Sequence, residues 1–283
     1  MEVTFYGTRG SCPCAGDAYA HFGGNTSCVL IDDGGDEPLI LDAGTGLRSL
    51  GADLAPALAA DGRSLRANLL LTHLHYDHLL GLPFFSPLHD AAAHLEVYGP
   101  SQGERTLAEV IKGAVGPPFF PVQMDDFYGE VRLLAVGDEP WKLGQAVITA
   151  SAVEHSGPTL GYRVEIGSSS VVYIPDHQAP VDATTIEPGV LALCEGADLL
   201  IHDAQYDDDE FERKCDWGHS TIAYAVHVAA TAGVKALALF HHDPMHDDAR
   251  LSALEALALT MPGAGDVGAI FSAYEGLTIS LED

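Results

Sequence analysis

The stretch Leu69-Leu70-Leu71-Thr72-His73-Leu74-His75-Tyr76-Asp77-His78 places three histidines and an aspartate directly after an apolar run. The three leucines predict a buried strand, and because alternate side chains of a strand share a face, we expect His73 and His75 to point the same way. Asp77 and His78 follow where the chain turns and are expected to face a second position close by. A single histidine here would be an ordinary surface residue, but imidazoles combined with a carboxylate are ligands of zinc, manganese and iron. Two such ions about 3.5–4 Å apart are a known device for hydrolysing phosphate esters, so the stretch predicts a metal centre.

Length and composition describe a globular protein of one large layered domain or two small ones. The chain has 283 residues, of which 47% are hydrophobic and 19% charged, and it is long enough to bury a substantial core. No apolar run approaches the roughly 18 residues needed to span a bilayer. Residues 1–7 enter a strand-like pattern at once and do not resemble a signal peptide. We therefore expect a cytoplasmic protein without membrane association.

The five cysteines are an odd number in a chain that is not expected to be secreted. Cys12 and Cys14 flank Pro13 and offer a weak metal-binding pattern. Reduced loop thiols are the favoured interpretation, with a metal site as the alternative.

The chain is strongly acidic, with a formal net charge of −28. Its only lysines are Lys112, Lys142, Lys214 and Lys235. A protein that grips a polynucleotide backbone carries a basic surface, so the charge argues against a polynucleotide partner. Bound divalent ions would offset part of the charge locally, which leaves a small anionic substrate open.

Short strands and helices alternate along the chain. Strands are expected at residues 3–6, 28–32, 39–41, 69–71, 95–100, 199–201, 236–240 and 277–281, with several more between 131 and 174. Helices are expected at residues 47–60, 102–115, 188–196, 221–232 and 247–260. Strands mixed with helices in both halves predict two packed sheets with helices outside. The aromatic, proline-rich segment 116–121 is expected to be irregular, either as a rim loop or as a packed connection.

Three further polar residues each end an apolar strand, namely His155, Asp176 and His241. Strand ends at one edge of a sandwich can converge, so we expect these residues to join the histidine motif. His242 directly follows His241 and is the alternative at this position. Asp42 ends the strand at 39–41 and is expected either to cap the next helix or to support a ligand histidine.

The order of these motifs resembles the metallo-β-lactamase superfamily, and within it the ribonuclease Z-like and cyclic-nucleotide phosphodiesterase-like branch. The resemblance covers nearly the whole chain and implies an α/β fold, a four-layer αββα sandwich of the metallo-β-lactamase type, in a single hydrolase domain at 1–283. It implies two metal positions, bridged by an aspartate that matches Asp176. The ligands that it implies are His73, His75 and His155 for the first metal and Asp77, His78 and His241 for the second. Ile174-Pro175-Asp176 replaces the Ser-Gly-Asp that is usual at the bridge.

A second pair of motifs, Ile201 to Tyr206 and Gly218 to Thr221, resembles the ribonuclease Z-like group. In that group the histidine of the second motif lies beside the substrate phosphate and assists proton transfer. The resemblance therefore implies this role for His219, with Asp203 holding its ring. By itself the pattern is also typical of a helix start with a serine or threonine cap.

Transfer-RNA-processing members of the branch carry a long glycine- and proline-rich arm soon after the motif that matches His155. Here residues 161–166 pass through 167–170 directly into Val171. This leaves no room for an arm and, with the acidic charge, argues against transfer RNA as the substrate.

We therefore expect a hydrolase with two divalent metal ions per chain, zinc first and manganese or iron as alternatives, that cleaves a small phosphodiester such as a cyclic nucleotide. Asp77 would orient the nucleophile as well as bind metal, and His219 would protonate the leaving alkoxide. Hydrolysis of a lactone, thioester or other carboxylic ester is the alternative activity. A metal-containing binding or sensing module without turnover is the alternative class of protein.

Three residues outside the motifs are candidates for holding the substrate: Arg9, Asn25 and Arg163. Surface or structural roles are the alternative for each. The resemblance also implies that a homodimer can form, since relatives in this branch are often dimers.

Overall fold

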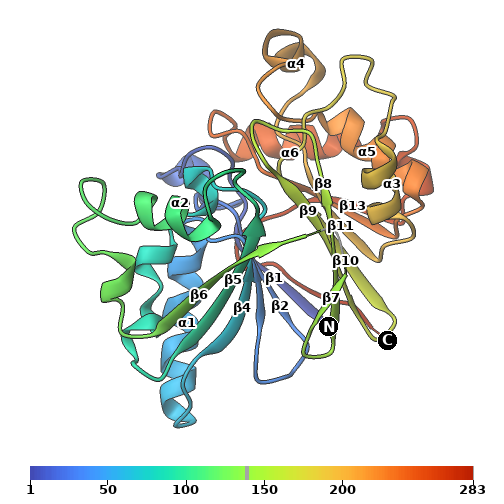
Figure 1. Cartoon of the computed structure of the whole chain (residues 1–283). Coiled ribbons are helices and arrows are strands. Elements are labelled where there is room, and N and C mark those ends of the chain that lie inside the picture. Colours follow the sequence, from blue (N-terminus) through green and yellow to red (C-terminus); the bar gives the residue numbers. More distant parts are fainter. Residues whose placement is uncertain (138–139, 283) are drawn as a thin grey trace.

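Two seven-stranded sheets stack face to face in the computed structural model, which describes residues 1–137 and 140–282 (Figure 1). In spatial order, the first sheet contains β14 (Thr278–Ser280), β1 (Glu2–Gly7), β2 (Cys28–Asp32), β3 (Leu39–Leu41), β4 (Arg66–Leu70), β5 (His94–Pro100) and β6 (Glu130–Val136). The second contains β13 (Ala269–Ser272), β12 (Ala236–Phe240), β11 (Leu199–Asp203), β10 (Ser169–Ile174), β9 (Leu160–Ile166), β8 (Ala146–Ala152) and β7 (Trp141–Leu143).

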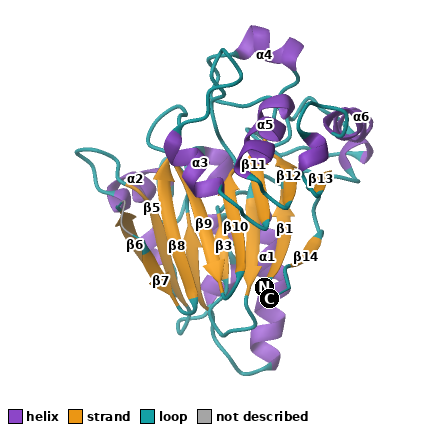
Figure 2. Ribbon diagram, turned by 90° about the vertical axis from the view of Figure 1, so that its right-hand side faces the viewer, coloured by secondary structure: helices purple, strands orange, loops and turns teal. Residues whose placement is uncertain are grey.

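Helices cover the outer face of each sheet (Figures 1 and 2). The first sheet packs against α1 (Gly46–Ala60) and α2 (Leu107–Ala114). The second packs against α3 (Pro188–Cys194), α5 (Ile222–Ala232) and α6 (Asp248–Ala258), while α4 (Asp208–Lys214) stands apart at the top of both views. The four layers confirm the expected αββα sandwich. Within the described residues, every helix is too short or too polar to cross a bilayer.

The core consists of three apolar layers, one between the sheets and one under the helices on each side. Strand β10 shows how one strand serves two layers. Val171 and Tyr173 face the other sheet, whereas Val172 and Ile174 face the helices. Because both faces are buried, the strand reads as a continuous apolar run instead of an alternating one. Each fully buried side chain of this kind contributes roughly 1.5–3 kcal/mol.

The directions of the strands determine which of the residues that follow them lie close together. Strands β10 to β13 are parallel, and so are β3 to β6. The carboxyl ends of parallel strands meet at one edge of a sheet. Residues that directly follow these strands are therefore brought together.

The strand before the histidine motif begins three residues earlier and ends one residue earlier than expected. Strand β4 ends at Leu70, and residues 72–75 form a loop. His73 and His75 do face the same group of side chains, as expected, but the alternation of a strand is not the reason, because both residues lie beyond the end of β4. The loop that follows β4 sets these directions instead.

Helix α2 begins at Leu107, five residues later than expected, because Thr106 caps it. The Thr106 side chain accepts a hydrogen bond from Glu109 N, and the Glu109 side chain accepts one from Thr106 N, which is a capping box. The segment 116–121 is irregular as expected, and Phe120 packs against the core of the first sheet.

Candidate metal centre

The polar residues that end the strands converge at one edge of the sandwich. His155 follows β8, Asp176 follows β10 and His241 follows β12, and these three strands of the second sheet run in one direction. The loop after β4 and the 3-10 helix Tyr76–His78 bring further histidines and Asp77 from the first sheet. Each sheet therefore contributes about half of the cluster.

Among the described residues, five groups of three side chains have potential ligand atoms within 4.8 Å of one another, and two of these groups contain neither Asp176 nor His219. One group is His73, His75 and His155, and the other is Asp77, His78 and His241. The structure thus brings together the two sets that the family resemblance implies for two metal positions.

Asp176 lies between the two groups, with one carboxylate oxygen toward each. Its Oδ1 lies 3.9 Å from His73 Nε2 and 3.6 Å from His155 Nε2. Its Oδ2 lies 3.0 Å from His78 Nε2 and 3.4 Å from His241 Nε2. An ionised carboxylate has two acceptor oxygens and can serve two cations at once. The position of Asp176 therefore fits a bridging ligand.

The outer ring nitrogens of three histidines are fixed by acceptors behind the cluster. The pairs are His78 Nδ1 with Asp42 Oδ2 at 2.8 Å, His155 Nδ1 with the Gly218 carbonyl at 2.6 Å, and His241 Nδ1 with Gln205 Oε1 at 2.8 Å. Carboxylate and carbonyl oxygens only accept, so each Nδ1 donates. In the neutral form of each ring, the Nε2 atom that faces the cluster then carries no proton, and this is the form that binds a metal.

His73 gives a direct test of whether the site fits a cation. Its Nε2 faces the cluster and is buried, and it has no hydrogen-bond partner among the described residues. Leaving a buried polar atom unpaired costs about 1–3 kcal/mol. A cation between His73, His75 and His155 would satisfy that atom. Imidazole nitrogens and carboxylate oxygens together suit a divalent transition metal.

The charges of the cluster also favour a cation. Burial alone would raise the pKa values of Asp77 and Asp176, but His78 and His241 hold both pKa values well below the usual range. Burial and the neighbouring His78 lower the pKa of His73. The pKa of His78 is raised despite its burial, because it faces Asp77 and Asp176. A divalent cation would displace that proton and neutralise the same carboxylates.

His241, and not His242, faces the cluster. His242 Nε2 donates to the Ala273 carbonyl at 2.8 Å and points away. His241 adopts a left-handed backbone with a φ of 58°, which turns its ring inward at the end of β12. Gly10 leaves the space for that ring, since a Cβ on Gly10 would lie 2.2 Å from His241 Nδ1.

Asp42 supports His78 and does not cap α1. Its Oδ2 accepts hydrogen bonds from His78 Nδ1 at 2.8 Å and from the Tyr173 hydroxyl at 2.9 Å, and its Oδ1 accepts from Thr72 N at 2.8 Å. The residue before α1 is Thr45, which makes no side-chain cap bond. The sequence left two roles open for Asp42, and the structure shows that it supports the ring of His78.

Asp42→Asn is therefore expected to weaken metal binding about 10- to 100-fold, because partners of ligand histidines contribute about that much. The amide keeps the size of the side chain but removes the charge that holds the His78 proton on Nδ1. Competition with a chromophoric chelator measures the affinity. Asp53→Asn on the exposed side of α1 is the matched control, and equal affinities for the two variants would contradict the expectation.

His219 lies beside the cluster and against Asp203. Its Nδ1 lies 2.9 Å from Asp203 Oδ2 and 3.7 Å from Asp176 Oδ1. Burial opposes the charged form, but Asp203 raises the pKa of His219 above its ordinary value. The cap of α5 is Thr221, whose side chain accepts from Tyr224 N at 3.0 Å. His219 is thus not the cap of α5, and its ring lies between Asp203 and the cluster.

Arg9 serves the structure and is closed to a substrate. The residue is fully buried, and its guanidinium donates to the carbonyls of Gly23 at 2.8 Å and His246 at 2.6 Å. It also faces Asp248 at 3.8 Å. The guanidinium therefore ties the first loop of the chain to the segment after β12.

Asn25 and Arg163 also have structural partners. Asn25 donates through its backbone and side-chain nitrogens to the Glu275 carboxylate at 2.6 and 2.9 Å. Arg163 donates to the carbonyls of Leu193 and Glu195 at 2.9 Å each, at the end of α3. The structural alternative thus replaces the expected substrate contact for both residues.

Ser11 is a site residue that the sequence did not reveal. Its backbone N–H donates to Asp77 Oδ2 at 2.7 Å. It also borders a hollow of about 360 Å³ that is lined in part by His75, Asp77, Asp176 and His219. The only signal for it is the glycine-containing loop that follows the first strand.

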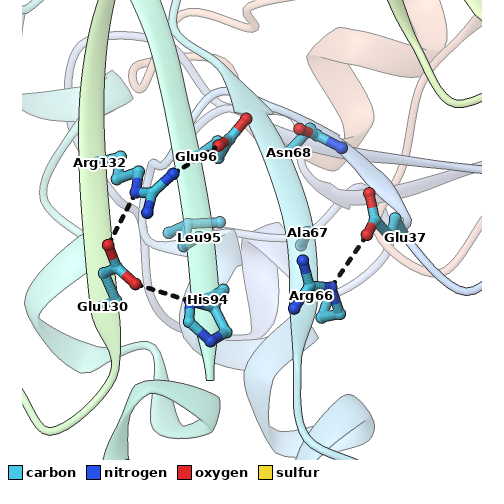
Figure 3. Close-up of a pocket in the computed structure, with 9 residues that line it drawn as sticks. All are labelled: Glu37, Arg66, Ala67, Asn68, His94, Leu95, Glu96, Glu130 and Arg132. Atoms are coloured by element: carbon cyan, nitrogen blue, oxygen red, sulfur yellow. Dashed lines mark hydrogen bonds and ion pairs between the residues drawn. The ribbon is translucent and has the colours of Figure 1, made fainter. Parts of the chain in front are cut away.

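A separate hollow of about 220 Å³ lies at the starts of β4, β5 and β6 (Figure 3). Ion pairs line it, including Arg132 with Glu130 at 2.7 Å, Arg66 with Glu37 at 3.0 Å and His94 with Glu130 at 2.9 Å. The charged groups pair with one another, and the histidine motif follows the other end of β4. This hollow therefore has no part in the metal centre.

Comparison with known proteins agrees with the fold. The sequence profile of the beta-lactamase superfamily domain matches residues 38–242. Ribonuclease Z from Natronomonas pharaonis is 29% identical over 289 aligned residues, which cover 85% of this chain and 86% of that protein. The crystal structure of the metallo-beta-lactamase fold protein YhfI from Bacillus subtilis has a TM-score of 0.71, at 22% identity, and covers 98% of both chains. That of human tRNase Z, short form, has a TM-score of 0.66, at 23% identity, and covers 100% of both chains.

The fold and the cluster define a metal-dependent hydrolase. The chain belongs to the beta-lactamase superfamily, since the family profile covers most of its length. The similarity to ribonuclease Z confirms the branch that the motifs indicate. The fold implies that divalent metal is bound.

Proposed function

We propose that the protein is a phosphodiesterase with two divalent metal ions per chain, formed by a single domain at 1–283, and that it hydrolyses a small phosphodiester such as a cyclic nucleotide. One observation carries the proposal. The two carboxylate oxygens of Asp176 are divided between two groups of three potential ligands. The pair of His219 and Asp203 lies directly beside them.

In this proposal the first ion is held by His73, His75 and His155, the second by Asp77, His78 and His241, and Asp176 is shared. The donor set suits zinc first, with manganese or iron as alternatives. When bound, the ions lower the pKa of water and neutralise charge on the phosphoryl oxygens.

Two residues orient and move protons in the reaction. Asp77, fixed by the N–H of Ser11, directs the attacking water toward phosphorus. His219 gives its Nε2 proton to the leaving oxygen as the P–O bond breaks, while Asp203 holds the proton on Nδ1. The Asp203 contact also favours the charged form of the ring, because it raises the pKa of His219.

Two features favour a small substrate. Strands β9 and β10 pair antiparallel and are joined by Gly167 and Ser168 alone, so the described chain has no arm at that position. The net charge of −28 works against a long polyanion. The name ribonuclease Z of the relatives supports phosphodiester chemistry, and the name tRNase Z of the human structural neighbour makes a transfer RNA the second candidate substrate.

A substrate panel tests the proposal. We expect cleavage of bis(p-nitrophenyl) phosphate and of a 3′,5′-cyclic nucleotide, loss of both activities with a chelator, and recovery with zinc or manganese. Little or no trimming of a precursor transfer RNA is expected. Efficient, specific trimming would overturn the choice of a small substrate, and faster cleavage of a carboxylic ester would overturn the reaction. A metal-loaded protein that cleaves none of these would instead be a binding or sensing module.

A further inference from the structure

A second, larger hollow also borders His219, and none of the proposed metal ligands lines it. It has a volume of about 540 Å³, and its lining includes Tyr206, Lys214, Trp217, His219 and Met245. Trp217 is 60% exposed and Met245 is 81% exposed. Two large apolar side chains thus stand open to solvent at the rim of a cavity that begins at the proposed proton donor.

Hydrogen bonds hold the backbone next to Trp217 in place. The next residue, Gly218, donates its N–H to Gln178 Oε1 at 2.7 Å, and its carbonyl accepts from His155 Nδ1 at 2.6 Å. Gly218 has a φ of +92°, and a Cβ there would lie 2.5 Å from His155 Nδ1. The residue that orients His155 therefore directly follows Trp217 and fixes the backbone on which this ring stands.

Lys214 contacts the aromatic residues that line the larger hollow and supplies a positive charge there. It is one of only four lysines in the chain, and it ends α4, which stands clear of the sheets (Figure 2). Its Nζ lies 4.3 Å from the centre of the Tyr206 ring, 5.6 Å from that of Trp217, and 3.0 Å from Asp243 Oδ2. An ammonium group near two aromatic faces is held by both, and its remaining N–H groups can donate to a ligand.

The two hollows share Ser11 and His219. Only the smaller one is lined by Asp77 and Asp176, so the phosphoryl group belongs there. A general acid must contact the oxygen that leaves, and the group attached to that oxygen then extends past His219 into the larger hollow.

We propose that the larger hollow is the subsite for the leaving group, and that it takes a nucleobase stacked on Trp217. This rests on the proposed phosphodiester chemistry and narrows it to nucleotide substrates. Aromatic side chains bind bases of any sequence through their faces. Lys214 is placed to donate to ring nitrogen or carbonyl acceptors of the base. A purely aliphatic leaving group would neither stack on Trp217 nor accept a hydrogen bond from Lys214.

Tryptophan fluorescence tests base binding without turnover. The chain has two tryptophans, so Trp141→Phe leaves Trp217 as the sole reporter. In this variant, loaded with zinc, adenosine 5′-monophosphate is expected to quench the emission and to bind about 5- to 150-fold more tightly than ribose 5-phosphate, the usual contribution of one stacked base. Equal affinities, or binding of the nucleotide without a change in emission, would overturn the subsite.

A kinetic comparison separates this subsite from the chemistry. Trp217→Ala is expected to lower kcat/KM for a 3′,5′-cyclic nucleotide about 5- to 150-fold but to leave the matching cyclic ribose phosphate without a base nearly unchanged. Trp217→Phe should retain most of the activity, and Phe119→Ala, which removes an aromatic side chain 71% exposed elsewhere, should retain all of it. Equal losses on both substrates would overturn the subsite while leaving the phosphodiesterase intact. Absence of turnover on any phosphodiester would overturn the proposed function. The fluorescence titration would still show whether the larger hollow binds a base, because it does not depend on turnover.

Discussion

Asp176→Ala is expected to lose metal from both positions and to abolish phosphodiester hydrolysis. Asp176 is 1% exposed, and each of its oxygens faces a different group of potential ligands. Removing a residue that merely supports a ligand costs about 10- to 100-fold in metal affinity, so removal of a shared ligand should cost at least about 100-fold at each position. Elemental analysis after reconstitution should find about two ions per wild-type chain and far less than one per variant chain.

Two further variants make this result specific. Asp176→Asn keeps one carbonyl oxygen of similar size, so we expect it to retain metal at one position and lose it at the other. Asp182→Ala removes an exposed aspartate six residues further along the chain and should retain both ions. If Asp176→Ala were folded and still held two ions, the bridging role would be wrong. At most one ion in the reconstituted wild type would likewise rule out two metal positions.

The cluster was predictable because its residues occupy a recurring place in the chain. His155, Asp176 and His241 each follow an apolar strand, and parallel strands bring their ends to one edge of the sheet. Residue identity and strand order are both visible in a sequence. The roles of these side chains as ligands remain a proposal that the metal analysis tests.

The partners that orient the cluster were less accessible to sequence reasoning. Arg9 bonds to the carbonyl of His246, a contact between residues 237 positions apart, and nothing near Arg9 in the sequence indicates it. The direction of His73 and His75 depends on the loop that follows β4, whose path follows from tertiary packing and not from the alternation of a strand. Helix α4 contains only one buried residue, Phe211, so it lacks the apolar periodicity that predicts a helix.

His219→Ala is expected to leave both metals bound and to slow the reaction in a way that depends on the leaving group. His219 lies outside the two groups of proposed ligands, and its Nδ1 bonds to Asp203 at 2.9 Å. General acid catalysis contributes about 10²- to 10⁴-fold. A loss of kcat of that size is expected for a cyclic nucleotide, whose leaving group is a ribose alkoxide. Bis(p-nitrophenyl) phosphate should lose far less, because p-nitrophenolate needs little protonation.

The pH profile should report the same proton. The pKa of His219 is raised because Asp203 outweighs the effect of burial. The acid form of the ring is thus present below this raised pKa, and kcat for the cyclic nucleotide should fall as the pH rises through it. His219→Ala should remove that descending limb. Asp203→Asn should shift it to lower pH, since the charge that raises the pKa is gone.

Matched controls distinguish proton transfer from a structural role. His94→Ala removes a half-exposed histidine at the opposite end of the strands (Figure 3) and should leave both rates unchanged. A histidine that only helped to start α5 would affect both substrates alike, through a loss of about 0.5–2 kcal/mol in stability. The cap of α5 is Thr221, so thermal unfolding of His219→Ala should stay close to that of the wild type. Equal losses on the two substrates, or loss of an ion, would show that His219 is not the proton donor.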